Sequence, residues 1–130
     1  AAFGDNESGQ CDVLSWKNVT KIDVAKGYTV GVTASGKVLF AGDGSSGQDE
    51  AASWKDITDI AAGTGHVLGI KKDKTMIAAG RNAQRECEVG SWKNIVSVAA
   101  GDDHSIGMDS TGGFYAVGYN GSGQCDVSGM

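Results

Sequence analysis

The stretch Ser53-Trp54-Lys55-Asp56-Ile57 decides the fold, because two close copies of it occur elsewhere in the chain. The copies are Ser15-Trp16-Lys17-Asn18-Val19 and Ser91-Trp92-Lys93-Asn94-Ile95, and each copy begins 38 residues after the one before. Glycines keep the same step, at positions 31, 69 and 107 and at positions 4, 42, 80 and 118. A period of this length is typical of an architecture in which each repeat is one supersecondary unit.

The period divides the chain into one partial repeat and three repeats. Residues 1–15 correspond to the last part of a connection between repeats, and the repeats follow at 16–53, 54–91 and 92–130, with the end of the third truncated. Residues 1–15 duplicate the repeat positions of residues 115–129, and Met130 stands where the next Trp would fall. The chain therefore carries two versions of the same connecting segment.

Each repeat is expected to form three short strands joined by tight turns. In the middle repeat the strands are predicted at 57–63, 66–70 and 75–80, followed by an irregular segment from 81 to 90. No segment has the extended 3.6-residue period of an amphipathic helix. The third strand is apolar on both faces, and the second has apolar residues on one face and glycine on the other. Covered faces and closely approached glycines predict small sheets stacked around an axis, an all-β propeller, with a linear solenoid as the alternative.

Composition narrows the classes of function. The 130 residues are enough for one domain, and a net charge of -5 with a pI near 4.8 argues against nucleic-acid binding. No apolar run reaches the 18 residues of a membrane span, so no membrane partner is expected.

The three cysteines, Cys11, Cys87 and Cys125, occupy one repeat position and are separated by whole repeats. That separation usually exceeds the ~7 Å between Cα atoms that a disulfide spans, so we expect free thiols and no zinc motif. Unpaired cysteines favour a reducing compartment such as the cytoplasm, although secretion remains open.

Two segments resemble a known family of repeats. Residues 98–104 read Val-Ala-Ala-Gly-Asp-Asp-His, and residues 117–124 read Val-Gly-Tyr-Asn-Gly-Ser-Gly-Gln. This pattern resembles the regulator of chromosome condensation repeat, and the compact 38-residue form is similar to the propeller-type β-lactamase inhibitor proteins of bacteria. The resemblance implies a β-propeller. The chain departs from it in having three repeats where the family's ring usually has seven blades, and the Gly-Gln turn is degraded at 84–86.

Three blades are too few to close a ring, since propellers close with about four to eight. An isolated wedge would expose an apolar face at each end, and such faces usually mark an interface. We therefore expect self-association, with two chains giving six blades. One of the duplicated end segments would then be disordered or would compete for one position. The alternative is that these repeats are part of a longer propeller.

Candidate chemical sites are better explained by the repeats. Residues 42–47 match G-x-G-x-x-G after a strand, but the helix that a dinucleotide site needs is not predicted after them. His66 and His104 share a repeat position with Tyr28, which favours packing or turn capping over general-base catalysis. Trp16, Trp54 and Trp92 share another, which favours packing between blades. The sequence indicates no catalytic residue, metal or cofactor.

A binding face follows from the topology. In a three-stranded antiparallel blade, the loops after the first and third strands open on the same face, and function concentrates on loops held by a rigid frame. Side chains at these positions differ between the copies and include types that anchor protein interfaces. The candidate partner-binding residues are Tyr28, Lys26, His66, Asp102, Asp103, His104, Asp43, Arg81, Arg85 and Tyr119.

The sequence thus predicts a non-catalytic propeller module for protein–protein interaction. Enzyme inhibition is the sharpest version, and the resemblance implies it because the same loops carry the partner contacts in the β-lactamase inhibitor proteins. The alternatives are a purely structural, self-assembling fragment of a longer repeat protein and a carbohydrate-binding propeller. Carbohydrate binding would need more exposed aromatic residues than Tyr28 and Tyr119 provide.

Overall fold

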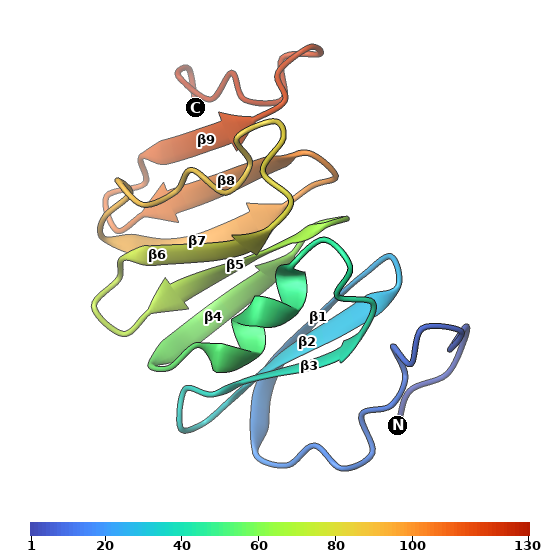
Figure 1. Cartoon of the computed structure of the whole chain (residues 1–130). Coiled ribbons are helices and arrows are strands. Elements are labelled where there is room, and N and C mark those ends of the chain that lie inside the picture. The colour runs from blue at the N-terminus through green and yellow to red at the C-terminus, as the bar shows by residue number, and fades with distance from the viewer.

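A computed structural model describes all 130 residues and contains three antiparallel three-stranded sheets that follow one another in chain order (Figure 1). We call the sheets blades 1, 2 and 3. Blade 1 consists of β1 (Val19–Ala25), β2 (Tyr28–Thr33) and β3 (Val38–Gly42). Blade 2 consists of β4 (Ile57–Ala62), β5 (His66–Lys71) and β6 (Met76–Gly80), and blade 3 of β7 (Ile95–Ala100), β8 (His104–Asp109) and β9 (Phe114–Gly118). The strands predicted for the middle repeat are confirmed to within one residue at each end.

One element was not predicted, the 3-10 helix η1 (Gln48–Ser53) in the connection between blades 1 and 2. It lies against β3 and β6 (Figure 1). The corresponding connection after blade 2 forms turns instead. Ala51 and Ala52 stand where that connection has Val89 and Gly90, and alanine favours helical backbone over β-branched residues and glycine.

The repeated Ser-Trp-Lys motif ends in Asn or Asp for a backbone reason. Asn18, Asp56 and Asn94 have φ of 56°, 58° and 57°, in the left-handed region that Asn and Asp tolerate better than most residues. Their carbonyls accept hydrogen bonds from the turn between the second and third strands, as when Lys72 N donates to Asp56 O over 2.7 Å. The motif therefore sets the entry of the chain into each blade.

The tryptophan of each motif lies flat on the glycine of its own blade. A Cβ at Gly69 would sit 2.9 Å from the Trp54 ring, and one at Gly107 would sit 2.8 Å from Trp92. The glycines therefore receive an indole ring, and the expected close approach by a neighbouring sheet is wrong in that detail. Trp54 and Trp92 are 7% and 4% exposed, which confirms that they pack between blades.

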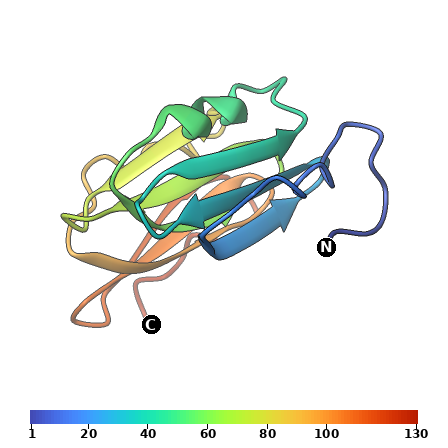
Figure 2. The same cartoon turned by 90° about the horizontal axis from the view of Figure 1, so that it is seen from below.

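Two apolar layers join the blades. Val30, Val32 and Val38 of blade 1 pack with Trp54 and Ile60 of blade 2 in the first layer. The second layer joins blade 2 to blade 3 and contains seven buried residues, namely Ala61, Leu68, Ile70, Met76, Val89, Trp92 and Ile95. Blade 2 thus has one face toward blade 1 and the other toward blade 3. The N-terminus lies at the blade 1 end of the stack and the C-terminus at the blade 3 end (Figures 1 and 2).

Residues 1–15 contact blade 1, where they occupy the position of a connection from a preceding blade. The Thr29 hydroxyl donates to Gln10 O over 2.8 Å, and Val13 and Trp16 line a cavity with Ile22 and Val24. In this single chain the N-terminal segment therefore fills the position for which disorder or competition was expected. The structure has no helix with the length and apolar character of a membrane span.

Candidate partner-binding face

The turns after the first and third strands of each blade lie at one end of the molecule. Within each blade a backbone hydrogen bond of 2.8 Å joins the two turns. The three bonds run from Asp43 N to Gly27 O, from Arg81 N to Gly65 O and from Tyr119 N to Asp103 O. This geometry agrees with the common face inferred from topology. We call the surface made by residues 5–8, 26–28, 43–46, 64–66, 81–85, 102–104 and 119–122 the loop face.

Most of the predicted partner-binding residues lie on the surface of the loop face. The exposed ones are Lys26, Asp43, Arg85, Asp102 and Tyr119, and the half-buried ones are Arg81, Asp103 and His104. Their role in binding stays a prediction.

Tyr28 and His66 are corrections, because both side chains are 0% exposed and neither can touch a partner from this position. The Tyr28 hydroxyl lies 2.6 Å from Gly63 O and 2.8 Å from His66 O, so it donates to carbonyls of blade 2. Its ring stacks on Phe40 with 5.3 Å between centroids. Tyr28 therefore ties blade 1 to blade 2, in line with the packing interpretation of this repeat position.

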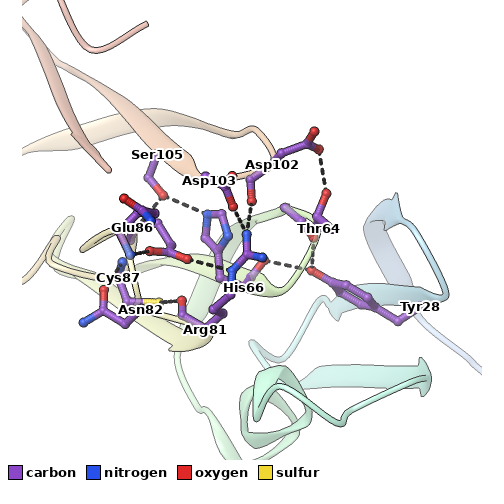
Figure 3. A network of polar contacts seen from close by, with 12 residues as sticks. Tyr28, Thr64, His66, Arg81, Asn82, Glu86, Cys87, Asp102, Asp103 and Ser105 are labelled. Carbon is purple, nitrogen blue, oxygen red and sulfur yellow. Dashed lines mark hydrogen bonds and ion pairs between the residues drawn. The ribbon is translucent and has the colours of Figure 1, made fainter. Parts of the chain in front are cut away.

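His66 makes the corresponding tie between blades 2 and 3 (Figure 3). Its Nε2 lies 3.0 Å from Ser105 Oγ, and the Ser105 hydroxyl donates to Glu86 O over 2.7 Å. Since the serine proton is engaged by the carbonyl, His66 Nε2 must donate, which leaves Nδ1 unprotonated and without a hydrogen-bond donor. Burial lowers the pKa of His66. This His–Ser pair is fully buried, so it is not placed to attack a substrate.

The segment at 81–86, which looked like a degraded turn, is rebuilt around an ion pair. Glu86 is 0% exposed, and its carboxylate accepts from Gln84 N over 2.7 Å and from Arg81 Nε over 3.1 Å. Burial raises the pKa of Glu86, but these hydrogen bonds and the Arg81 charge outweigh it and the net shift is downward. Arg81 and Glu86 thus replace the glutamine contacts of the other loops.

Arg81 also reaches across to blade 3 (Figure 3). Its Nη2 donates to Asp102 O over 2.8 Å and pairs with the Asp103 carboxylate. Beside it, the Thr64 hydroxyl donates to Asp102 Oδ1 over 2.6 Å. The loops of blades 2 and 3 are therefore braced against each other by side chains.

A hollow of about 450 Å³ opens on the loop face where the first strands end. It is lined by one turn from each blade. The residues are Val24, Ala25, Lys26, Ala62, Gly63, Thr64, Ala100, Gly101 and Asp102. Its polar side chains differ from blade to blade, so the hollow has no repeat symmetry.

The G-x-G-x-x-G segment at 42–47 is a closed turn. Ser45 N donates to Asp43 Oδ1 over 2.8 Å, Ser46 N to Gln48 Oε1 over 2.9 Å and Gly47 N to Gly44 O over 2.9 Å. Because the amides that would cradle a phosphate are engaged within the loop, the repeat-turn interpretation fits this segment.

The three thiols occupy equivalent places in the connections, and each donates to a backbone carbonyl. The acceptors are Asp5 O for Cys11, Arg81 O for Cys87 and Tyr119 O for Cys125, at 3.4, 3.2 and 3.5 Å. All three are free in the structure. Burial and the Glu86 charge raise the pKa of Cys87 to about 11, so its thiol stays protonated at neutral pH.

Sequence reasoning missed Thr64, Glu86 and Ser105 as members of this network. One signal was available for Glu86. It replaces the Gln at positions 10, 48 and 124 in the same loop where Arg81 replaces Asp or Tyr. Two coupled departures from a repeat indicate contact between them, and the structure shows that contact.

Comparison with known proteins gives the class of the fold. Residues 95–124 match the model of the regulator of chromosome condensation (RCC1) repeat. No curated protein matches the chain. The three sheets are similar to part of Prp20p from Saccharomyces cerevisiae, with a TM-score of 0.69 and 20% identity over 81% of this chain and 32% of that one.

Two further structures agree. Human WBSCR16 is similar with a TM-score of 0.74 and 15% identity, over 89% of this chain and 41% of that one. The CRINKLY WD40 ectodomain of the Arabidopsis thaliana receptor kinase ACR4 is similar with a TM-score of 0.62 and 16% identity, over 79% and 37%. At these identities the likeness concerns the fold alone. The chain is thus an RCC1-like stretch of β-propeller that spans about a third of the length of Prp20p. The comparisons give no support for the likeness to β-lactamase inhibitor proteins.

Proposed function

We propose that this chain is a non-catalytic propeller module that binds another protein through its loop face. The observation that carries the proposal is a set of exposed, chemically different side chains on braced loops. Lys26, Asp102 and Tyr119 project from turns whose backbones are hydrogen-bonded within each blade. Because such loops lose little conformational freedom on binding, most of the contact energy is available for affinity.

The exposed charges favour a partner with a basic patch, because acidic side chains (Asp5, Glu7, Asp43 and Asp102) outnumber basic ones (Lys26 and Arg85) among the exposed residues of the loop face. Asp43 and Asp102 are exposed on the loop face, whereas the Asp103 charge is compensated by Arg81. Tyr119 is 45% exposed and offers an aromatic anchor beside them. The opposite end of the molecule is rich in lysine and would repel such a patch. Its lysines are Lys17, Lys37, Lys55, Lys71, Lys72, Lys74 and Lys93.

One structurally similar protein, yeast RCC1 (Prp20), binds other proteins. Prp20p is described with its binding properties to Gsp1p and histones, and yeast RCC1 (Prp20) with Kap60 bound to it. This likeness supports protein binding as a use of the fold, and the partner of this chain follows from its own surface.

The test compares the wild-type chain with two variants that carry three substitutions each. The loop-face variant carries Asp43→Asn, Asp102→Asn and Tyr119→Ala. The amide oxygens of the two asparagines can still accept the hydrogen bonds from Ser45 N and the Thr64 hydroxyl. The control carries Lys37→Ala, Lys72→Ala and Ser110→Ala on exposed turns at the opposite end. We expect the wild-type chain and the control to crosslink the same protein in native extract, and the loop-face variant to lose it. Equal capture by all three would contradict the proposal.

Enzyme inhibition is the finer version of this function. A purified β-lactamase is a defined probe for it, because the resemblance in sequence points to that class of target. Inhibition by the wild-type chain that the loop-face variant loses would support this version. Absence of inhibition would exclude that target and leave the broader test in extract to decide the proposal.

A further inference from the structure

The outer face of blade 1 is exposed at positions where blade 2 is buried. Ile22 and Val24 of β1 are 60% and 62% exposed, whereas the equivalent Ile60 and Ala62 are 2% and 8% exposed. Blade 1 covers Ile60 and Ala62, whereas only residues 1–15 lie over Ile22 and Val24. Blade 1 therefore presents an apolar surface of the kind that receives a preceding blade.

The outer face of blade 3, which points away from blade 2, is also exposed. Phe114 is 38% exposed, whereas Val38 and Met76 at the same repeat position are 3% and 6% exposed. Ile106 is half-buried, whereas the equivalent Leu68 is 0% exposed. Blade 3 therefore presents the kind of surface that packs on a following blade.

These two exposed faces are matched halves of a contact that the chain already makes twice. The blade 1 to blade 2 layer and the blade 2 to blade 3 layer both pair a face of the Val38 type with a face of the Ile60 type. The exposed faces are one of each type. Packing them together repeats an arrangement that is already stable within the molecule.

A polar pair points to this chain's own blade 1 as the surface that blade 3 fits. In the internal contacts, Tyr28 packs in the same apolar layer as Val67, and His66 lies against the Ser105 hydroxyl, which is the repeat equivalent of Val67. The outer face of blade 3 carries His104, and the equivalent of Ser105 on blade 1 is Thr29, also a hydroxyl. Thr29 Oγ1 donates to Gln10 O just as Ser105 Oγ donates to Glu86 O, so its oxygen is likewise free to accept from a histidine. His104 and Thr29 are thus matched across the two outer faces.

We propose that two copies of this chain associate head to tail, each packing the outer face of its blade 3 on the outer face of the other's blade 1. Two such contacts close a ring of six blades, with His104 Nε2 of one copy donating to Thr29 of the other. Only His104 belongs to both this surface and the loop face, and it is unchanged in the loop-face variant, so the two proposals are tested separately.

The ends of the chain compete within this contact. Residues 120–126 repeat the internal bonds of residues 6–12: Cys11 N donates to Asn6 Oδ1 and Cys125 N to Asn120 Oδ1, each over 2.7 Å. Either segment can therefore lie over blade 1. The C-terminal segment of the other copy must therefore displace the N-terminal segment on association, which lowers the net affinity of the two copies.

The first experiment measures molar mass by light scattering across a dilution series. We expect a mass of twice the 13.3 kDa chain that falls to that of one chain on dilution. Val24→Asp should keep the protein monomeric, because it places a charge in the contact between the two copies. The fold of the monomer should tolerate it, because Val24 is 62% exposed there. Val96→Asp is the matched control, since Val96 is 42% exposed and its equivalents Thr20 and Thr58 are exposed in every blade. A single chain at all concentrations, another closed multiple, or a Val24→Asp dimer would overturn the proposal.

The second experiment tests the orientation of the contact. Thr29→Val should weaken the dimer about tenfold or more, because it leaves the His104 donor without an acceptor. Adding His104→Tyr should restore most of the affinity, because Tyr opposite Val copies the internal pair of Tyr28 and Val67. His104→Tyr alone is the remaining corner of the cycle. Additive effects of the two substitutions would show that these residues do not meet and would overturn the head-to-tail arrangement.

Discussion

Glu86 occupies the position of Gln10, Gln48 and Gln124, and it keeps half of the glutamine's role. Gln48 accepts from Ser46 N through Oε1 and donates to Asp43 O through Nε2. Glu86 accepts from Gln84 N in the same way, and its carboxylate, which cannot donate, accepts a second bond from Arg81 Nε. A substitution that buries a charge is thereby tolerated, because a second substitution in the loop pairs it.

The coupling predicts a compensating pair of substitutions. Arg81→Ala should lower the free energy of unfolding by about 2 kcal/mol, a value reduced for the partial exposure of Arg81, because it leaves a buried carboxylate without its cation. Arg81→Ala with Glu86→Gln should recover most of the loss, because an amide at position 86 still accepts from Gln84 N, as Gln48 accepts from Ser46 N, and leaves no buried charge without its cation. Urea unfolding of the wild-type chain, Arg81→Ala and the double variant measures this. A double variant as unstable as Arg81→Ala would contradict the coupling.

The burial of His66 leads us to expect that the free energy of unfolding falls on mild acidification. Burial lowers the pKa of His66, with Arg81 and His104 acting in the same direction and Glu86 against it. Below the unfolded value of 6.5 the unfolded chain takes up a proton that the folded chain does not, so the free energy of unfolding falls with pH until the folded pKa is passed.

The measurement is urea unfolding at about pH 7.5 and about pH 5.5 for the wild-type chain and for His66→Gln. The variant should show a smaller difference between the two pH values, whatever its absolute stability. An equal difference in both proteins would show that His66 does not drive the decline.

The element that defines each blade is the tryptophan lying on its glycine strand, and the three copies are not equally covered. Trp54 is 7% exposed between blades 1 and 2, whereas Trp16 is half-buried beneath residues 1–15 alone. The same residue in the same motif therefore contributes differently according to whether another blade lies on it.

Trp54→Ala should lower the free energy of unfolding by about 3–5 kcal/mol, because it empties the layer between two blades. Trp16→Ala is the internal control and should cost clearly less in a single chain. Thermal or urea unfolding at concentrations where the chain is single compares them. Equal losses would mean that the N-terminal segment covers its tryptophan as well as a blade does.

At the scale of the whole molecule, most of the correct predictions follow from the 38-residue period of the sequence. It located the strands, the common loop face and the layers between blades, because a repeat without insertions forces equivalent residues into equivalent places. It could not separate Tyr28 and His66 from the exposed residues of the same loops. Their burial depends on how the next blade covers the turn, which is a tertiary fact. The sequence did not predict the ion pair of Arg81 and Glu86, because the departure of this loop from the repeat pattern was interpreted as loss of the turn and not as a pair of compensating substitutions.

The stack also predicts how protection from hydrogen exchange is distributed. In a repeat array the free energy of opening depends on the number of covered faces. Blade 2 is covered on both, and β5 is buried at all but its last residue, so its amides should exchange most slowly in a single chain. Blades 1 and 3 should open first, each from its outer face.

Exchange followed by mass spectrometry at low and high protein concentration tests this ordering and the head-to-tail contact together. Association should raise protection in β1 and β9, which border the outer faces, while β5 changes least. Val24→Asp should show the single-chain pattern at every concentration. If β1 and β9 are as protected as β5 in the single chain, then the three blades open as one cooperative unit and uncovered faces do not govern local stability.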